Sequence, residues 1–297
     1  MMVGAGPVLC GVDFSDPSRR ALRCARDLAS RLGQSLIVVS TVDPLLAEAA
    51  NVRMGPAPFT DRVRRDLEAF VQETLGPQQT GGPTVSFRTP IGHAAKELLA
   101  AAKASGASVT VLGTEGLGRA RRLVLGSTTL RVMRGTDRPV LAVPPPRDRT
   151  ASPSPAAGVI TRILCGVDFS DPSRTAAAAA VALARRLNVP VTLVHAAARL
   201  TLPSIWDVMV APTDDEREAQ GRTNLEALAA TLGPPKPAVH AAVGEPDEII
   251  GEQAAAGEGV LIVLGLGDLS GHRPGSTAMR IMAETHVPVL AVPPAPE

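Results

Sequence analysis

The segment CGVDFSDPSR occupies residues 10–19 and returns letter for letter at residues 165–174. The segment PVLAVPP likewise occurs twice, at residues 139–145 and at residues 288–294. Repeats of this length do not arise from composition, so we infer two copies of one domain, with starts offset by 155 positions. A chain of 297 residues has room for two domains of ordinary size.

We place the two copies at residues 1–144 and 160–297. The segment between them, residues 145–159, is rich in proline, serine and small residues, which is typical of a semi-extended linker. The division into three parts is therefore our expected domain organisation.

Within each copy, short apolar runs typical of buried strands alternate with stretches typical of helices. Ser15-Asp16-Pro17 supplies a cap and a proline for a first helix that ends before Gly33, and a loop is expected through Met54. The expected strands are 7–12, 35–42, 84–89, 108–113 and 139–143, then 160–167, 190–196, 237–243, 260–264 and 288–292. The other expected helices are 61–75, 93–104 and 127–134, then 172–187, 213–232, 246–256 and 276–286.

This alternation predicts an α/β fold made of two tandem doubly wound domains. Each is expected to be a five-stranded parallel sheet with helices on both faces. In such sheets, ligands bind beyond the carboxyl ends of the strands, where the strand order reverses. The topology therefore places a site at the ends of the first and fourth strands, at Val12-Asp13 and Leu112-Gly113.

Composition narrows the choice of ligand. The chain has five phenylalanines, one tryptophan and no tyrosine, which argues against a surface that stacks single-stranded nucleic acid. The net charge of +1 hides a split, because residues 1–150 carry +7 and residues 151–297 carry −6. The first half thus suits an anionic ligand, and opposite charges could also help the halves, or two chains, associate.

Other classes of protein find no support in the sequence. Three cysteines without CxxC spacing and five scattered histidines predict neither a disulfide framework nor a metal site. The first residues lack the basic and apolar regions of a secretory leader, and no apolar run approaches the ~20 residues that span a membrane. We therefore expect a soluble cytoplasmic protein that makes no membrane contact.

The segment after the fourth strand reads GTEGLGRARRLVLGST, from Gly113 to Thr128. Gly113 and Gly116 let the backbone turn tightly and approach a ligand. Gly126, Ser127 and Thr128 offer unpaired N–H groups at a helix N-terminus, together with two hydroxyls, which favour a phosphate. Three arginines add positive charge between these elements: Arg119, Arg121 and Arg122.

On these residues the chain resembles a tandem universal stress protein. The ATP-binding signature of that family is G-x2-G-x9-G-[ST], and residues 113–127 match it in full. The VDFS segment and the PVLAVP strand also match, so the resemblance covers nearly the whole chain apart from the linker. It implies a Rossmann-like, adenine nucleotide alpha hydrolase-like fold with ATP as ligand.

The resemblance also implies which residues touch the nucleotide. The adenine and ribose side would be lined by Gly11, Val12, Asp13 and Thr41, and the ribose and phosphates would be surrounded by Leu112, Gly113, Gly116, Gly126, Ser127 and Thr128. Asp13 could accept from a ribose hydroxyl or hold Mg²⁺ through water. An Asx turn or helix cap is the alternative role for Asp13, and the favoured one for Asp168.

The second copy departs from the signature. Gly265 and Gly275 are 10 positions apart, where the first copy has 13, and Asp268 stands at the place of the second glycine. His272 and Arg273 replace the three arginines. A carboxylate repels a triphosphate, so we expect one working site, in the first copy.

Some residues are better explained by structure than by chemistry. We expect Cys10, Cys24 and Cys165 to be buried as small hydrophobes, and His93 to be a surface or capping residue. The three arginines could equally be a solvated basic loop.

Three kinds of function fit these features. The leading one is a stress regulator or sensor in which ATP binding changes conformation or association. The second is an enzyme such as an adenylating ligase, but DFSDPSR replaces the SGGxDS-type loop of those enzymes, and no general base or nucleophile is visible. Slow ATP hydrolysis stays open. The third is an interaction module that needs no nucleotide.

The final strand of each copy predicts how the copies associate. Its apolar sequence would leave an edge open to pairing, and single domains of the resembled family dimerise through this strand. We therefore expect residues 139–143 to pair with 288–292 in an intrachain pseudo-dimer. A homodimer of whole chains and regulatory protein partners stay open.

Overall fold

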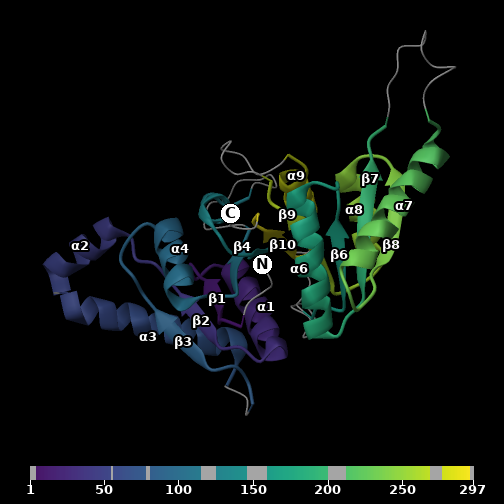
Figure 1. The fold of residues 1–297 in the computed structure, drawn as a ribbon. Coiled ribbons are helices and arrows are strands. Elements are labelled where there is room, and N and C mark those ends of the chain that lie inside the picture. Colours follow the sequence, from purple (N-terminus) through teal and green to yellow (C-terminus); the bar gives the residue numbers. More distant parts are fainter. Residues whose placement is uncertain are drawn as a thin grey trace, which may run out of the picture.

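The computed structural model describes residues 5–54, 56–77, 81–114, 125–145, 159–199, 212–267 and 276–294. The described strands form one ten-stranded sheet in the order β3-β2-β1-β4-β5-β10-β9-β6-β7-β8 (Figure 1). The strands are β1 (Val8–Gly11), β2 (Leu36–Val39), β3 (Val85–Arg88), β4 (Val109–Gly113), β5 (Val140–Val143), β6 (Arg162–Gly166), β7 (Val191–Ala197), β8 (Ala238–Val243), β9 (Val260–Gly265) and β10 (Val289–Val292). Each half contributes five parallel strands in the same doubly wound order, as predicted.

The two halves join in the middle of the sheet. β5 and β10 pair antiparallel, with Leu141 opposite Leu290, and this pairing confirms the predicted intrachain contact. The other strand pairings run parallel. Because the antiparallel pair relates two copies of one fold, it creates an approximate twofold axis normal to the sheet.

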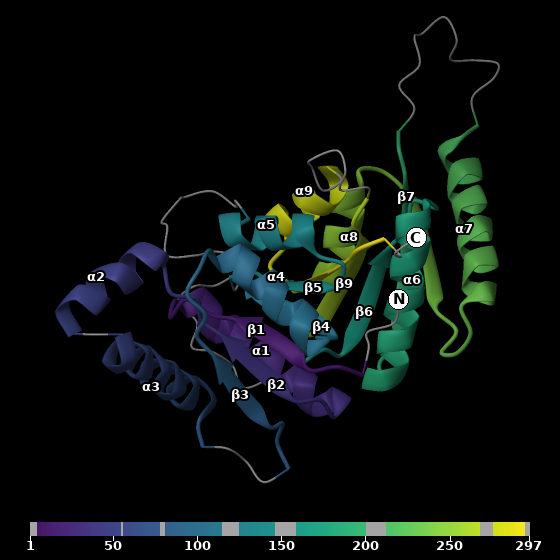
Figure 2. The same ribbon diagram turned by 60° about the vertical axis from the view of Figure 1, so that its left-hand side comes forward.

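Helices cover both faces of the sheet. They are α1 (Asp16–Leu32), α2 (Pro44–Met54), α3 (Pro56–Leu75), α4 (Ala94–Ser105), α5 (Ser127–Gly135), α6 (Asp171–Leu187), α7 (Asp214–Thr231), α8 (Pro246–Ala255) and α9 (Ser276–Glu284). One apolar cluster joins α1, α3, α6 and α7 through residues such as Leu22 and Leu183. The other joins α4, α5, α8 and α9 through residues such as Leu98 and Met282, so these four helices share one face (Figure 2).

The first helix of each half is specified by the repeated segment. Ser15 caps α1 by accepting from the Ser18 N–H, and Ser170 caps α6 in the same way. A proline follows in each first turn, where its missing N–H costs nothing. The predicted start of both helices is confirmed.

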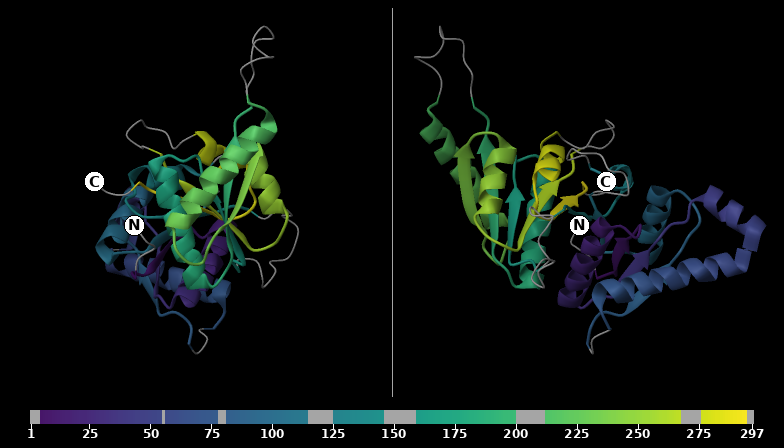
Figure 3. Two further views of the ribbon diagram at one scale, coloured as in Figure 1. Left: turned by 45° about the vertical axis from the view of Figure 1, so that its right-hand side comes forward. Right: turned by 180° about the vertical axis from the view of Figure 1, so that it is seen from behind.

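The expected loop through Met54 is wrong, because the structure has helix α2 there. Asp43 caps this helix, since its Oδ1 accepts from the Leu45 N–H at 2.8 Å. Leu45 is 76% exposed and Val52 is 83% exposed, so α2 lacks the buried apolar stripe that identifies a helix in sequence. It lies at the outer end of α3, away from the sheet (Figure 3).

A pair of arginines joins the C-terminal ends of α1 and α6. Arg31 donates to the carbonyl oxygen of Leu187 at 2.8 Å and to that of Ile160. Arg186 donates to the carbonyl oxygen of Leu32 at 3.3 Å. Arg31 and Arg186 occupy equivalent positions, 155 residues apart, so each helix receives a cation from the other at its negative end.

Candidate functional site

The strand order of the first half reverses between β1 and β4. β1 pairs with β2 on one side and with β4 on the other. The chain therefore continues from β1 to β2 on one side of this point, and from β4 to β5 on the other. Val12 extends β1 by donating to the carbonyl oxygen of Val39 at 2.9 Å, and Thr114 extends β4 by donating to that of Val143 at 3.1 Å. This is the crevice position at which doubly wound sheets bind their ligands.

Two predicted glycines at this edge have packing roles. A Cβ on Gly11 would lie 2.6 Å from Leu112 Cδ2 and 2.9 Å from Leu98 Cδ2. A Cβ on Gly113 would lie 3.0 Å from Pro17 Cβ, so Gly113 lets the first turn of α1 approach the end of β4. Gly11, Leu112 and Gly113 thus allow close packing at this edge of the sheet, independently of any ligand.

The N-terminus of α5 is fixed against the end of β4. Gly126 donates to the carbonyl oxygen of Thr114 at 2.6 Å, and the Thr129 hydroxyl donates to that of Gly113 at 2.8 Å. Gly126 is the N-cap and offers no side chain to the helix, while Ser127 is exposed and Thr128 is half-buried. The first N–H groups of α5 are therefore left without a side-chain cap at the crevice.

Thr129 is a site residue that the sequence reasoning missed. It is buried on α5, and its hydroxyl carries the contact that ties the helix to β4. The sequence did contain a signal for it, because Thr129 is the third polar residue in succession after Gly126 and stands at a helix position that faces the core.

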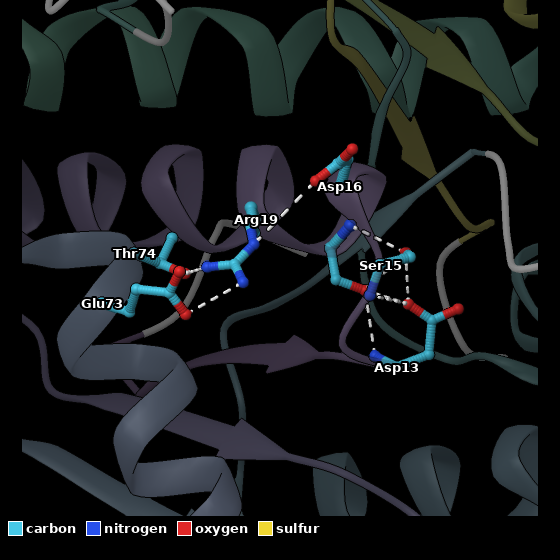
Figure 4. A network of polar contacts seen from close by, with 7 residues as sticks. Asp13, Ser15, Asp16, Arg19, Glu73 and Thr74 are labelled. Carbon is cyan, nitrogen blue, oxygen red and sulfur yellow. Dashed lines mark hydrogen bonds and ion pairs between the residues drawn. The ribbon is translucent and has the colours of Figure 1, made fainter.

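Asp13 makes the Asx turn that the sequence offered as the alternative. Its Oδ1 accepts from the Ser15 N–H at 3.2 Å and from the hydroxyls of Ser15 and Ser18. The Asp13 N–H donates to Ser18 Oγ at 2.9 Å. Figure 4 shows the other carboxylate oxygen turned away from these serines. The turn thus fixes the carboxylate at the carboxyl end of β1, and its role as a ligand contact stays a prediction.

The turn that carries Asp13 is anchored on α3. Phe14 has a φ of 63°, a conformation that side chains rarely adopt, and its ring meets that of Phe70 edge to face at 5.2 Å. Arg19 lies 4.5 Å from the Phe70 ring centre and donates to Thr74 and Glu73 at 2.9 and 3.0 Å (Figure 4). These contacts hold the strained turn in one position.

The remaining predicted residues lie at the same edge or outside the described part. Thr41 follows β2 by two residues and is half-buried, and the next residue, Val42, donates to the carbonyl oxygen of Pro90 at 2.9 Å. Val12 and Thr41 thus follow the ends of paired strands β1 and β2. Gly116 and the three loop arginines lie outside the described residues.

The second half has the same fold but different residues at the corresponding edge of the sheet. Alanines stand where the first half has polar groups, with Ala278 at the position of Thr129 and Ala196 at that of Thr41. Partial burial raises the pKa of Asp168, but hydrogen bonds from Ser170 and Ser173 outweigh burial and hold this pKa below its ordinary value. Asp168 therefore makes the Asx turn expected for it. Gly275, Asp268, His272 and Arg273 lie outside the described residues.

The three cysteines are buried, as predicted. Among the described residues, no three metal-ligating side chains of His, Cys, Asp or Glu gather at one point. Among the described helices, none combines the length and apolar character required to cross a bilayer. His93 is exposed at the start of α4, as expected of a surface residue.

Comparison with known proteins identifies the fold and the family. A family model described as the universal stress protein family matches residues 5–144 and 160–293. A universal stress protein of Mycolicibacterium smegmatis is 28% identical over 302 residues, covering 97% of each chain. A universal stress protein of Thermus aquaticus is 31% identical over 137 residues, covering 46% of this chain and 96% of the relative.

A solved structure supports the same architecture. The crystal structure of a universal stress protein from Archaeoglobus fulgidus superimposes with a TM-score of 0.62 at 16% identity, covering 99% of this chain and 98% of that one. At this identity the likeness concerns the fold alone. With both halves matched by the family model, the chain belongs to the universal stress protein family.

Proposed function

We propose that the first half binds an adenine nucleotide, ATP with Mg²⁺, and that binding regulates the conformation or association of the protein in stress. The observation that carries this proposal is the N-terminus of α5. It has no side-chain cap and is tied to the end of β4 at the point where the strand order reverses. Backbone N–H groups at such a terminus, with the field of the helix dipole behind them, favour a phosphate.

The other residues of the crevice fit a nucleotide by their chemistry. Ser127 and Thr128 would donate hydroxyls beside the phosphates, and Gly113 and Gly126 let a ligand approach the backbone. Gly11, Val12, Asp13 and Thr41 would face the adenine and ribose. Bound magnesium would offset phosphate charge, and the outward oxygen of Asp13 would reach it through water.

Residues 1–144 and 160–297 then have different roles, joined by the linker at 145–159. The second half lacks the polar contact of Thr129 and has a segment three residues shorter between Gly265 and Gly275. We assign it a weak site or none.

Calorimetric titration with ATP and Mg²⁺ tests the proposal on the full chain. Ser127→Glu places a carboxylate where the phosphates would bind, and Ser276→Glu places one at the equivalent first residue of α9. An acidic residue is favourable at a helix N-terminus, so both variants should fold. Charges a few ångströms apart near a protein surface repel by about 1–4 kcal/mol per pair.

We therefore expect one site per chain, at least tenfold weaker binding for S127E, and wild-type binding for S276E. Titration in EDTA reports the contribution of magnesium. No heat of binding for the wild type, or equal losses in the two variants, would contradict the proposed site.

A further inference from the structure

The four helices that share one face of the sheet carry opposite charges in the two halves. On α4 and α5 the exposed charged side chains are Lys96, Lys103, Arg131 and Arg134, and one half-buried carboxylate, Glu97, opposes them. We call these four cations the basic end. On α8, its N-cap and α9 the exposed carboxylates are Glu245, Glu248, Glu252 and Glu284, which we call the acidic end.

At one pair of structurally equivalent positions the sign of the charge is reversed. A Cβ on Gly11 would meet Leu98 of α4, and a Cβ on Gly166 would meet Ile250 of α8, so Leu98 and Ile250 correspond. Two residues earlier in each helix, Lys96 therefore corresponds to Glu248.

The arginine shared by both halves shows the same contrast. Arg280 of α9 donates to Glu245 at 3.1 Å and to Asp247 at 2.7 Å, so its charge is balanced within the second half. Arg131 stands at the same position of α5, but α4 has His93 and Ala95 where α8 has those carboxylates. The first half thus keeps an exposed arginine that α4 does not neutralise.

We propose that this face is the contact between two copies of the chain. The approximate twofold axis through β5 and β10 passes between the basic end and the acidic end, so both lie at similar distances from it. A second copy, placed face to face and turned by half a turn, brings its acidic end onto the basic end of the first. The same rotation brings the other two ends together, which makes the contact closed and isologous.

Charge complementarity of this kind sets the orientation of partners and makes association depend on salt. The signs of the two ends agree with those of the halves, which carry +7 and −6. The charges that make this contact belong to the protein alone, so the contact can be tested without nucleotide and separately from the proposed function.

Sedimentation equilibrium of the full chain at low and high salt provides the test. We expect a dimer at low ionic strength that dissociates toward 1 M salt, where the Debye length falls to about 3 Å. Lys96→Glu with Arg131→Glu leaves two cations and two carboxylates at the basic end, and Glu248→Lys with Glu252→Lys leaves the same balance at the acidic end. Each double variant alone should bind itself at least tenfold more weakly than the wild type, because its altered end no longer attracts the end that it faces.

An equimolar mixture of the two double variants should form dimers more readily than either variant alone, since the unaltered acidic end of the first then meets the unaltered basic end of the second. Arg62→Glu with Arg64→Glu on α3, in the other helix layer, is the control with the same change in net charge. It should leave the dimer intact. A wild-type monomer at low salt, a dimer that both double variants retain, or a mixture that stays monomeric would overturn the proposal.

Discussion

Removing the Arg31 side chain should weaken the contact between the two halves and lower the stability of the protein. Arg31→Ala deletes two hydrogen bonds from a guanidinium, to the carbonyl oxygens of Ile160 and Leu187. Hydrogen bonds to charged groups contribute about 1.5–3 kcal/mol each, and a cation near a helix C-terminus adds about 0.3–1 kcal/mol. Because Arg31 is only partly buried and the two bonds share one side chain, we expect a total loss of about 2–3 kcal/mol.

The measurement is urea unfolding followed by circular dichroism, combined with hydrogen exchange at β5 and β10. Arg31→Ala should lower the free energy of unfolding and speed exchange at that junction. Arg31→Lys keeps the charge but cannot bond two carbonyls in the same geometry, so it should recover only part of the loss.

Arg26→Ala is the control, because Arg26 donates to the carbonyl oxygen of Leu75 at 3.2 Å within its own half. It should cost about 1 kcal/mol without changing exchange at the junction. Wild-type stability of Arg31→Ala, or equal exchange at the junction in the Arg31 and Arg26 variants, would refute the reasoning.

Four further predictions concern the edge and the cores. Gly265→Ala should destabilise by about 2–3 kcal/mol in urea melts and Gly113→Ala by about 1 kcal/mol. The added Cβ would lie 2.5 Å from the Pro172 carbonyl oxygen in the first, but no closer than 3.0 Å to any atom of Pro17 in the second. Equal effects would show that this geometry does not decide the cost. Thr129→Ala imitates the second half and should cost about 1 kcal/mol while weakening nucleotide binding, as calorimetry would report. The pKa of Asp168 is lowered in the folded state, so its stabilisation is present above the ordinary value of 3.8 and is lost as the pH falls through the folded value. Urea melts should therefore separate Asp168→Asn from wild type at pH 7, and the gap should narrow as the pH falls below 3.8; a constant gap would contradict this. Burial, reinforced by the charge of Asp27, raises the pKa of Cys24 to about 12, so this thiol should react with a disulfide reagent at pH 8 only after unfolding.

The fold could be predicted from sequence because its signals are local or repeated. Continuous apolar strands, the Ser15 and Ser170 caps and the duplicated final strand gave the element order and the pairing of β5 with β10. Helix α2 was missed because Leu45 and Val52 are exposed and leave no amphipathic period.

The same cap chemistry could have identified α2. Asp43 caps it and Pro44 is its first residue, as Ser15 caps α1 and Pro17 lies in the first turn of α1. An N-cap signal without a buried stripe does not by itself distinguish a helix from a turn, since both motifs use the same residues.

The candidate site was predictable in position but only partly in contacts. The strand order located the edge, whereas the anchoring of the Asp13 turn depends on Phe14 meeting Phe70 from a distant helix. The tie between Thr129 and Gly113 joins residues 16 positions apart through a side-chain rotamer, which sequence does not specify. The bond from Arg31 to Leu187 spans 156 positions and has no local signal.

The antiparallel contact between β5 and β10 should also be insensitive to dilution of the protein. Its partners belong to one polypeptide, so their effective concentration is set by the linker and does not fall when the protein is scarce. In a pair of identical chains, any substitution appears on both sides of the contact. Here a substitution alters one side alone. The second half can therefore have Ala278 at the position of Thr129, and Glu248 at that of Lys96, while the two halves still share one sheet.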